Sequence, residues 1–386
     1  MSGSAASQPK TALVLAGGGA RAAYQVGVIK AIGEMLPRDA PNPFPILCGT
    51  SAGAINATAL AIYARRFNEG VRRLNYVWKN FEVEQVFRSD AWGISRTGAH
   101  WLLAMAFAGL GRHNPQSLLD RTPLRGLLER LLPCEEIETS IDAGALLALS
   151  ITASGYGSGQ SVTFFQAAEG VKIWERVNRV GAATRITVDH LMASSAIPFL
   201  FAPVRINREH FGDGSMRQTA PLSAAIHLGA DRVLVIGTRR EKQPSSVRPE
   251  IKENPTLAQI AGHVLDSIFL DALEADLERL DRINKTVALI PTRQLKEHGV
   301  TLRQVDPLVI SPSQSLEQIA AKHAHHLPRS VRYLLRGIGA FNRSGANLVS
   351  YLLFERPYTR ELIGLGYADT MMRRAEVLPF LGYEPN

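Results

Sequence analysis

The sequence predicts an α/β protein with a mostly parallel central sheet and helices on the faces of that sheet. Three observations support this prediction. The chain has 386 residues, 46% of them hydrophobic and 20% charged, which is ordinary for a globular protein with a large core. Its first 65 residues repeat the order strand, glycine turn, helix twice. Further short apolar runs of strand length alternate with helical patterns downstream.

The two repeats at the start of the chain define the expected core elements. The first runs from a β-type apolar segment at residues 11–16, through glycines 17–19, into a helix predicted over residues 21–36. The second has a short strand at residues 46–48 and an alanine-rich helix at residues 52–65, again separated by a glycine-containing turn. Strands that are each followed by a helix favour a parallel arrangement.

The rest of the chain carries elements of both kinds. Strands are expected at residues 146–153, 161–166, 231–237 and 285–290. Helices are expected at residues 189–196, 257–282, 315–336, 347–353 and within 358–381. The polar segment 241–255 contains three prolines and reads as a linker or exposed loop.

Composition narrows the class of protein. The net charge of +8 favours an anionic partner, either nucleic acid or an anionic bilayer, unless the chain is simply basic. Two cysteines, Cys48 and Cys134, provide neither a disulfide framework nor a metal-binding spacing, so a reducing compartment is expected. The start of the chain does not resemble a secretory signal, and no run of about 20 apolar residues could span a bilayer. We therefore expect a cytoplasmic protein.

Residues 49–53, Gly-Thr-Ser-Ala-Gly, match the pattern G-x-S-x-G. A nucleophilic serine must stand free on a sharp turn between a strand and a helix, and Gly49 and Gly53 remove the side chains that would clash there. Ser51 would lie at the first turn of the following helix, whose amides favour a developing negative charge. The motif therefore predicts Ser51 as a nucleophile, although a simple tight turn could have the same sequence.

Acyl transfer at such a serine also needs amide donors for an oxyanion, and the first glycine turn offers them. The N–H groups of Gly18 and Gly19 can approach a ligand closely because these residues lack side chains. Arg21 adds a positive charge on the first helical turn. The same segment loosely fits a dinucleotide fingerprint with Asp39 downstream, but Asp39 falls in a proline-rich stretch and not after a second strand.

The third motif is an aspartate between two glycines, Asp213, in Phe-Gly-Asp-Gly-Ser. Taken together, the sequence resembles the patatin-like phospholipases over about residues 11–237. The resemblance rests on GGGAR, GTSAG, ASSAIPFLFAPV and the stretch DGSMRQTAPLSAAIHLGADRVLV, which occur in this order. The chain departs from the usual family pattern at Ala22, where the family often has glycine, and at Ser215, where the family usually has glycine or alanine.

The resemblance implies a three-layer α/β/α fold with a mostly parallel sheet, plus a helical C-terminal extension. It divides the chain into a catalytic domain at residues 11–240 and a mainly helical region at residues 241–386. It implies a Ser–Asp dyad in which Ser51 is the nucleophile and Asp213 the general base. The implied oxyanion hole is framed by Gly17, Gly18, Gly19 and Arg21.

The dyad has rivals that the sequence leaves open. A Ser-His-Asp triad is possible in principle because histidines follow Asp213 at positions 227, 263, 298, 323, 325 and 326, but none lies in a recognisable motif. A thioesterase or an acyltransferase could use the same dyad. A non-catalytic lipid-binding protein and a nucleotide-binding oxidoreductase are the alternatives from other classes.

The expected substrate is a membrane phospholipid or another acyl-ester lipid, handled without a cofactor or a metal ion. No nucleic acid partner is expected, whereas an anionic membrane surface is a possible partner and would make the protein peripheral. Residues 101–110 form either an interfacial element or a core helix. Residues 322–343 read as a basic amphipathic helix, which could lie on a bilayer or, as we prefer, pack its apolar face on the core.

Overall fold

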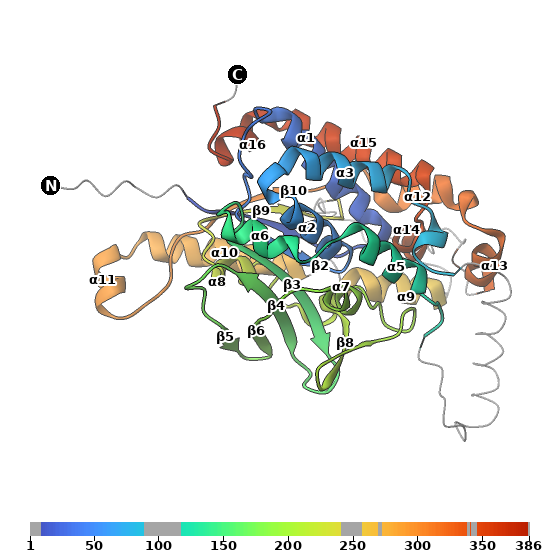
Figure 1. Cartoon of the computed structure of the whole chain (residues 1–386), viewed down its shortest axis with the longest axis horizontal. Coiled ribbons are helices and arrows are strands. Elements are labelled where there is room, and N and C mark those ends of the chain that lie inside the picture. Colours follow the sequence, from blue (N-terminus) through green and yellow to red (C-terminus); the bar gives the residue numbers. More distant parts are fainter. Residues whose placement is uncertain are drawn as a thin grey trace, which may run out of the picture.

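The computed structural model describes residues 9–88, 117–240, 257–268, 272–337, 340 and 346–384. Ten strands form one sheet (Figure 1). They are β1 (Thr11–Leu15), β2 (Ile46–Thr50), β3 (Ala148–Gly155), β4 (Ser161–Ala167), β5 (Trp174–Arg176), β6 (Arg179–Ala183), β7 (Val204–Ile206), β8 (Glu209–Asp213), β9 (Arg232–Ile236) and β10 (Asp306–Ile310).

The sheet is parallel at its centre and mixed at one side. Along the main path the order is β10-β9-β1-β2-β3-β4-β6-β5, and the five strands from β10 to β3 are all parallel. β4 runs antiparallel to β3, and β8 pairs antiparallel with both β3 and β7. The predicted mostly parallel sheet is therefore confirmed.

Helices flank the sheet on both faces. The main ones are α1 (Ala23–Met35), α2 (Ala52–Ile62), α3 (Phe67–Lys79), α5 (Thr122–Leu131), α6 (Glu136–Asp142), α7 (Val188–Ser194), α8 (Ser223–His227), α9 (Leu257–Asp266), α10 (Ala272–Ala288), α11 (Thr292–Glu297), α12 (Leu316–His323), α13 (Arg329–Gly337), α14 (Ala346–Leu352), α15 (Arg356–Met372) and α16 (Arg374–Phe380). Short 3-10 turns include η1 (Gly19–Ala22), η2 (Ala64–Arg66), η3 (Val83–Gln85), η4 (Gly214–Arg217) and η6 (Ala324–His326).

Successive side chains of the central strands point to opposite faces of the sheet and so contribute to two separate hydrophobic cores. In β1, Leu13 and Leu15 face the larger core, which also contains apolar residues of α1, α2, α3 and α15. Ala12 and Val14 point to the opposite face and join residues of α8 and α10. Because neighbouring side chains of a strand point to opposite faces, a strand that is buried on both faces reads as a continuous apolar run. This explains why β1, β2 and β9 were recognisable from sequence.

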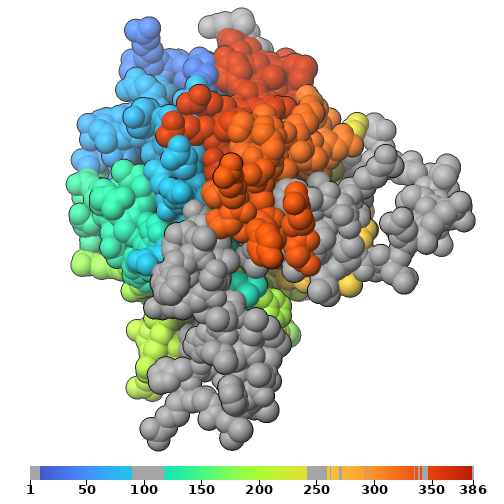
Figure 2. All heavy atoms as spheres, turned by 90° about the vertical axis from the view of Figure 1, so that its right-hand side faces the viewer, coloured from blue at the N-terminus to red at the C-terminus, as the bar shows by residue number. Residues whose placement is uncertain are grey.

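The C-terminal region packs closely on the N-terminal helices. The backbones of α1 and α15 approach so closely that a Cβ on Gly27 would lie 2.1 Å from the carbonyl oxygen of Ile363. The same holds for Gly366, whose added Cβ would lie 2.2 Å from the carbonyl oxygen of Tyr24. Figure 2 shows the red and orange C-terminal helices against the blue N-terminal elements. β10 also joins the sheet, so the sheet extends past residue 240, and the division at this residue stays a prediction.

One expected strand is wrong, and five strands of the sheet, β5, β6, β7, β8 and β10, were not expected. Residues 285–290 lie at the end of α10, where Lys285 pairs with Asp281 one turn earlier at 2.6 Å and Leu289 is exposed. The strand that joins the sheet nearby is instead β10, which contains Pro307. Proline cannot donate to a sheet ladder and is tolerated at an edge, which is where β10 lies.

The helices predicted near the C-terminus are more divided than expected. The segment 315–336 is broken before α13, at Pro328, and the segment 358–381 holds two helices, α15 and α16. Residues 101–110, the whole of 241–255 and Arg343 lie outside the described residues. Within the described ranges, no helix combines the length and apolar character needed to cross a bilayer.

Candidate active site

The pairing register of β3 brings the two predicted catalytic residues together. β2 runs parallel to β3 and ends where Thr50 lies opposite Thr152. β8 runs antiparallel to β3 and ends where Asp213 lies opposite Ala153, the next residue of β3. Both strands flank β3 on the same side, so their C-terminal ends meet head to head. Ser51, which follows β2 directly, therefore faces Asp213.

Ser51 lies on a strained turn of the kind that the motif predicts. Its φ of 55° is unusual for a residue with a side chain. A Cβ on Gly49 would lie 2.5 Å from the backbone at the start of α2, and one on Gly53 would lie 2.2 Å from the backbone of β1. The Ser51 N–H donates to Ser194 Oγ at 2.9 Å, and that hydroxyl donates to the Thr152 carbonyl at 2.6 Å. α7 and β3 thus fix the turn.

Asp213 is fully buried at the end of β8. Its Oδ1 accepts a hydrogen bond from the Ser215 N–H at 3.0 Å, and its own N–H donates to the Ala196 carbonyl at 2.9 Å. The next residue is Gly214, and a Cβ on it would lie 2.0 Å from the carbonyl oxygen of Thr152. A residue with a side chain therefore does not fit at this position. Oδ2 has no hydrogen-bond partner among the described residues. A buried carboxylate oxygen without a partner is unusual in a folded protein and calls for an explanation.

Burial raises the pKa of Asp213 to about 6, because the ionised form loses its hydration. The Ser51 hydroxyl and the Ser215 amide lower this pKa again, as does the positive charge of Arg121. The Ser51 hydroxyl is thus close enough to stabilise the carboxylate, although the contact does not have the geometry of a conventional hydrogen bond. The resulting pKa suits a general base at neutral pH better than the usual value for aspartate.

The glycine turn lies beside the serine and is shaped by residues far along the chain. The Thr238 hydroxyl donates to the Gly17 carbonyl at 3.0 Å. A Cβ on Gly18 would press on the Thr238 side chain, and one on Gly19 would lie 2.3 Å from the carbonyl oxygen of Tyr351. No hydrogen bond to another described residue engages the N–H group of Gly18 or Gly19. These two amides are therefore available as donors.

The side chain of Arg21 lies behind the glycine turn, and its place in the oxyanion hole stays a prediction. Its side chain is fully buried and pairs with Asp266 and Glu317 of the C-terminal helices. Since these carboxylates engage its charge, the Arg21 guanidinium belongs to a network behind the glycine turn. It does not line the cavity that contains Ser51.

An apolar cavity of about 600 Å³ opens at Ser51. Ile55 and Ala59 line it from one face of α2, together with Ser51 and Tyr63, the residues that flank this helix. Most of the remaining wall consists of aliphatic and aromatic side chains from other elements, among them Leu74, Val77, Trp78, Phe81, Val86, Leu124, Leu127, Leu128, Leu132, Ile197, Phe201 and Phe354. The cavity therefore suits a long apolar group whose reactive end lies at the serine.

Some residues of the site could not be found from the sequence. Arg121 is buried at the start of α5, where it donates to the carbonyls of Met192 and Ala202. Arg121 lies 92 residues before Asp213, and the residues next to it in the sequence form no motif that would indicate a role at the site. Ser194 belongs to the segment that carries the family resemblance, which is the only signal that could have found it.

The rival sites lack support in the geometry. None of the six histidines that follow Asp213 lines the cavity at Ser51. His227 stacks on Trp174 at 4.9 Å, and His323 contacts Glu361 at 2.5 Å. Asp39 lies in an exposed turn after α1, so it cannot serve as the acidic residue of a dinucleotide fingerprint. The described residues contain no cluster of His, Cys, Asp and Glu that could hold a metal ion.

Ser51 on its strained turn and Gly19 line the apolar cavity, and the buried Asp213 lies beside Ser51. The model of the patatin-like phospholipase family matches residues 13–226, which is more than half of the chain. The chain belongs to the patatin-like phospholipase family. Membership of this family supports lipid hydrolase activity.

Two solved structures are similar to this chain at low identity. VipD from Legionella pneumophila aligns with 15% identity and a TM-score of 0.31, over 92% of this chain and 67% of that one. Human GIVD cytosolic phospholipase A2, in complex with methyl γ-linolenyl fluorophosphonate, aligns with 12% identity and a TM-score of 0.44, over 97% of this chain and 59% of that one. No curated protein sequence matches the chain.

The raised pKa of Asp213 predicts a pH-dependent stability cost. As the pH rises from about 4 to about 6, the unfolded chain ionises this group while the folded chain still holds the proton, so folding loses stability. At pH 8, Asp213→Asn removes the buried charge and should raise the free energy of unfolding by about 1–3 kcal/mol. Denaturant unfolding at several pH values measures this gain, which should shrink as the pH falls toward 4.

The matched control is Asp142→Asn, because Asp142 is exposed at the end of α6. It should show no gain that depends on pH. If Asp213→Asn were less stable than the parent chain at pH 8, the carboxylate would not carry the burial cost that its surroundings imply.

Proposed function

We propose that the protein is a lipid acyl hydrolase, an esterase of the phospholipase A or lysophospholipase type, with Ser51 as nucleophile and Asp213 as general base. One observation carries the proposal: the ends of β2 and β8 meet on β3 and place a serine hydroxyl against a buried carboxylate at an apolar cavity. The family supports the reaction class.

The proposed reaction has two halves. Ionised Asp213 takes the proton of Ser51 as Oγ attacks the ester carbonyl carbon, and the N–H groups of Gly18 and Gly19 hold the oxyanion. The intermediate collapses, Asp213 passes its proton to the departing alcohol, and an acyl-Ser51 ester remains. Asp213 then deprotonates a water that attacks this ester, and its proton returns to Ser51 as the fatty acid leaves.

The cavity indicates which part of the substrate the protein holds. Its wall is mainly aliphatic and aromatic, and Ser51, which directly precedes α2, is followed by Ile55 and Ala59 along one face of that helix. An acyl chain whose carbonyl lies at Ser51 would therefore extend along this helix. A cavity of about 600 Å³ lies within the ordinary size range of small-molecule sites, and burial of an apolar chain favours binding there. The substrate class is thus a fatty acyl ester of a membrane phospholipid or a similar lipid.

We also propose that the protein works at a membrane surface, because its substrates reside there. The net charge of +8 would favour an anionic lipid surface. The apolar side chains of Val331 and Leu335 in α13 are buried in the main core, so these two residues are not available for this contact. The arginines Arg329 and Arg336 of α13 are exposed and could contribute charge alone.

The dyad is tested by two substitutions. Ser51→Ala and Asp213→Asn should each lower kcat by at least about 1,000-fold on a panel of diacyl phospholipid, lysophospholipid, neutral glyceride and acyl thioester. The loss follows because one variant lacks the nucleophile and the other lacks the base. Release of free fatty acid measures the rate.

The controls Ser140→Ala and Asp142→Asn make the same chemical changes outside the cavity and should keep full activity. Full activity in Ser51→Ala or Asp213→Asn would refute the dyad. A preference for the acyl thioester over every oxygen ester would favour the thioesterase alternative. An inactive parent chain that still binds lipid would favour a lipid-binding protein.

Ala59 offers a test of the acyl cavity. It lies eight residues after Ser51 on the same face of α2, which is about 12 Å along the helix. Ala59→Trp should fill the cavity beyond the first helical turn, so the variant should hydrolyse a butyrate ester at nearly the parent rate and a palmitate ester at least about tenfold more slowly. An unchanged ratio of kcat/KM between the two esters would contradict an acyl chain along α2.

A further inference from the structure

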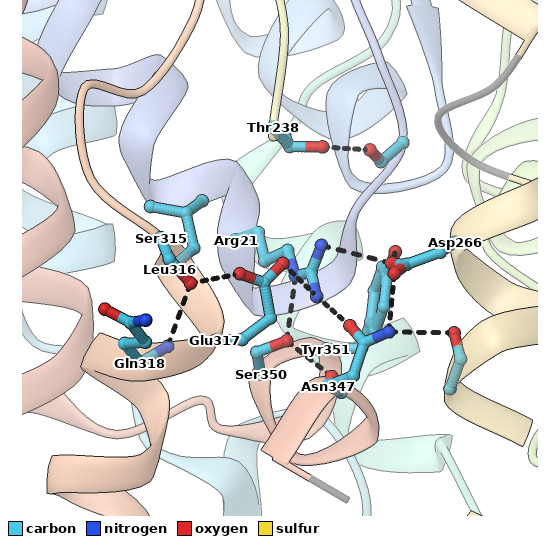
Figure 3. A network of polar contacts seen from close by, with 12 residues as sticks. Arg21, Thr238, Asp266, Ser315, Leu316, Glu317, Gln318, Asn347, Ser350 and Tyr351 are labelled. Atoms are coloured by element: carbon cyan, nitrogen blue, oxygen red, sulfur yellow. Dashed lines mark hydrogen bonds and ion pairs between the residues drawn. The ribbon is translucent and has the colours of Figure 1, made fainter. Parts of the chain in front are cut away.

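Arg21 is a fully buried cation two residues after the glycine turn of the proposed oxyanion hole. Figure 3 shows the side chains that surround it. Nη1 lies 3.4 Å from Asp266 Oδ1, and Nη2 lies 3.0 Å from Glu317 Oε1. Nε donates to Ser350 Oγ at 2.8 Å, and Nη2 also donates to Asn347 Oδ1. We call Arg21 and these four partners the arginine clamp.

The partners of Arg21 come from three separate helices. Asp266 is the last residue of α9, Glu317 lies in the first turn of α12, and Asn347 and Ser350 belong to α14. All of them lie beyond residues 13–226, the part of the chain that the family model matches. The partners also bind one another, since the Asn347 amide donates to Asp266 Oδ2 at 2.6 Å.

The same C-terminal helices touch the backbone of the glycine turn. The carbonyl oxygen of Tyr351 in α14 lies against Gly19 and leaves no room for a Cβ there. The Tyr351 ring lies under the Arg21 guanidinium at 4.0 Å, and its hydroxyl donates to Asp266 at 2.8 Å. The Arg21 N–H in turn donates to the Gly18 carbonyl at 3.1 Å. The clamp therefore connects α9, α12 and α14 to the turn that carries the two free amides.

Electrostatics make the position of Arg21 depend on its partners. A guanidinium removed from water is tolerated only when opposite charges and hydrogen-bond acceptors surround it. If one carboxylate is neutralised, the buried cation is left partly uncompensated, so either the side chain moves or water enters. Because Arg21 lies two residues after Gly19, such a movement passes directly to the amides.

We propose that Asp266, Glu317 and Asn347 are positioning residues that hold the Gly18 and Gly19 amides toward Ser51 through the side chain of Arg21. This inference rests on the proposed function, because it assigns a role to the oxyanion hole of that reaction. The C-terminal helices, outside the matched part of the chain, thereby complete the active site. A displacement of about 1 Å at such a site can cost about 100-fold in rate.

The test uses the full chain with Asp266→Asn and Glu317→Gln, which keep the size of each side chain and remove its charge. Each variant should lose about 10- to 100-fold in kcat on the preferred ester, with KM changed by less than about threefold. The rate of reaction with a fluorophosphonate should fall in parallel, since the same amides hold its oxygen.

Asp369→Asn is the matched control. Asp369 is a buried carboxylate of α15 that accepts hydrogen bonds from the Tyr24 hydroxyl at 3.0 Å and the Ser313 hydroxyl at 2.6 Å, and it does not contact Arg21. Loss of the Asp369 carboxylate should lower the melting temperature and leave kcat within about twofold of the parent chain. A general loss of stability is thereby separated from a loss of positioning.

If Asp266→Asn and Glu317→Gln fold and keep the parent kcat, the clamp is structural only and the proposal is overturned. Should either variant fail to fold, Arg21→Lys replaces it, because lysine keeps the charge and loses the planar fork of donors. An unchanged kcat in Arg21→Lys also overturns the proposal. These outcomes are distinct from failure of the proposed function, which would appear as activity in Ser51→Ala.

Discussion

The pairing of β3 with two strands that approach from opposite directions is the constraint on which the site depends. β2 and β8 end at adjacent positions of β3, opposite Thr152 and Ala153. A shift of one residue in either pairing would turn the terminal side chain to the other face of the sheet. The sharp turn at Ser51 and the close contact at Gly214 follow from this meeting, because each chain must leave the sheet where the other ends.

The site places charge where water is excluded, and the surrounding fold compensates for it in two different ways. Asp213 keeps an unpaired oxygen and a raised pKa, so its burial cost is retained and prepares it to accept a proton. Arg21, in contrast, is surrounded by two carboxylates and several acceptors, so its charge is compensated and its position is fixed. The buried carboxylate of Asp213 is thus left reactive, whereas the buried guanidinium of Arg21 holds the backbone of the glycine turn in place.

Local patterns predicted the parts of this arrangement that are local in the chain. The strand, turn and helix around Ser51 were recognisable because glycine spacing and apolar runs act within a few residues. The role of Asp213, 162 residues further on, came from the family resemblance and not from its own surroundings. Features that depend on distant parts of the chain could not be predicted. The edge strand β10 contains a proline, which argues against a strand when only the sequence is known. The partners of Arg21 lie on helices whose packing against one another no pattern in a single sequence encodes.

The most direct measurement of the central claim is the pH dependence of the reaction between the intact protein and a fluorophosphonate, with the modified residue mapped by mass spectrometry. If the carboxylate beside Ser51 is the base, the label forms on Ser51 alone, and its rate falls about tenfold per pH unit below the pKa of Asp213, about 6. A label on another residue, or a rate on Ser51 that does not change between pH 8 and pH 5, would contradict the dyad.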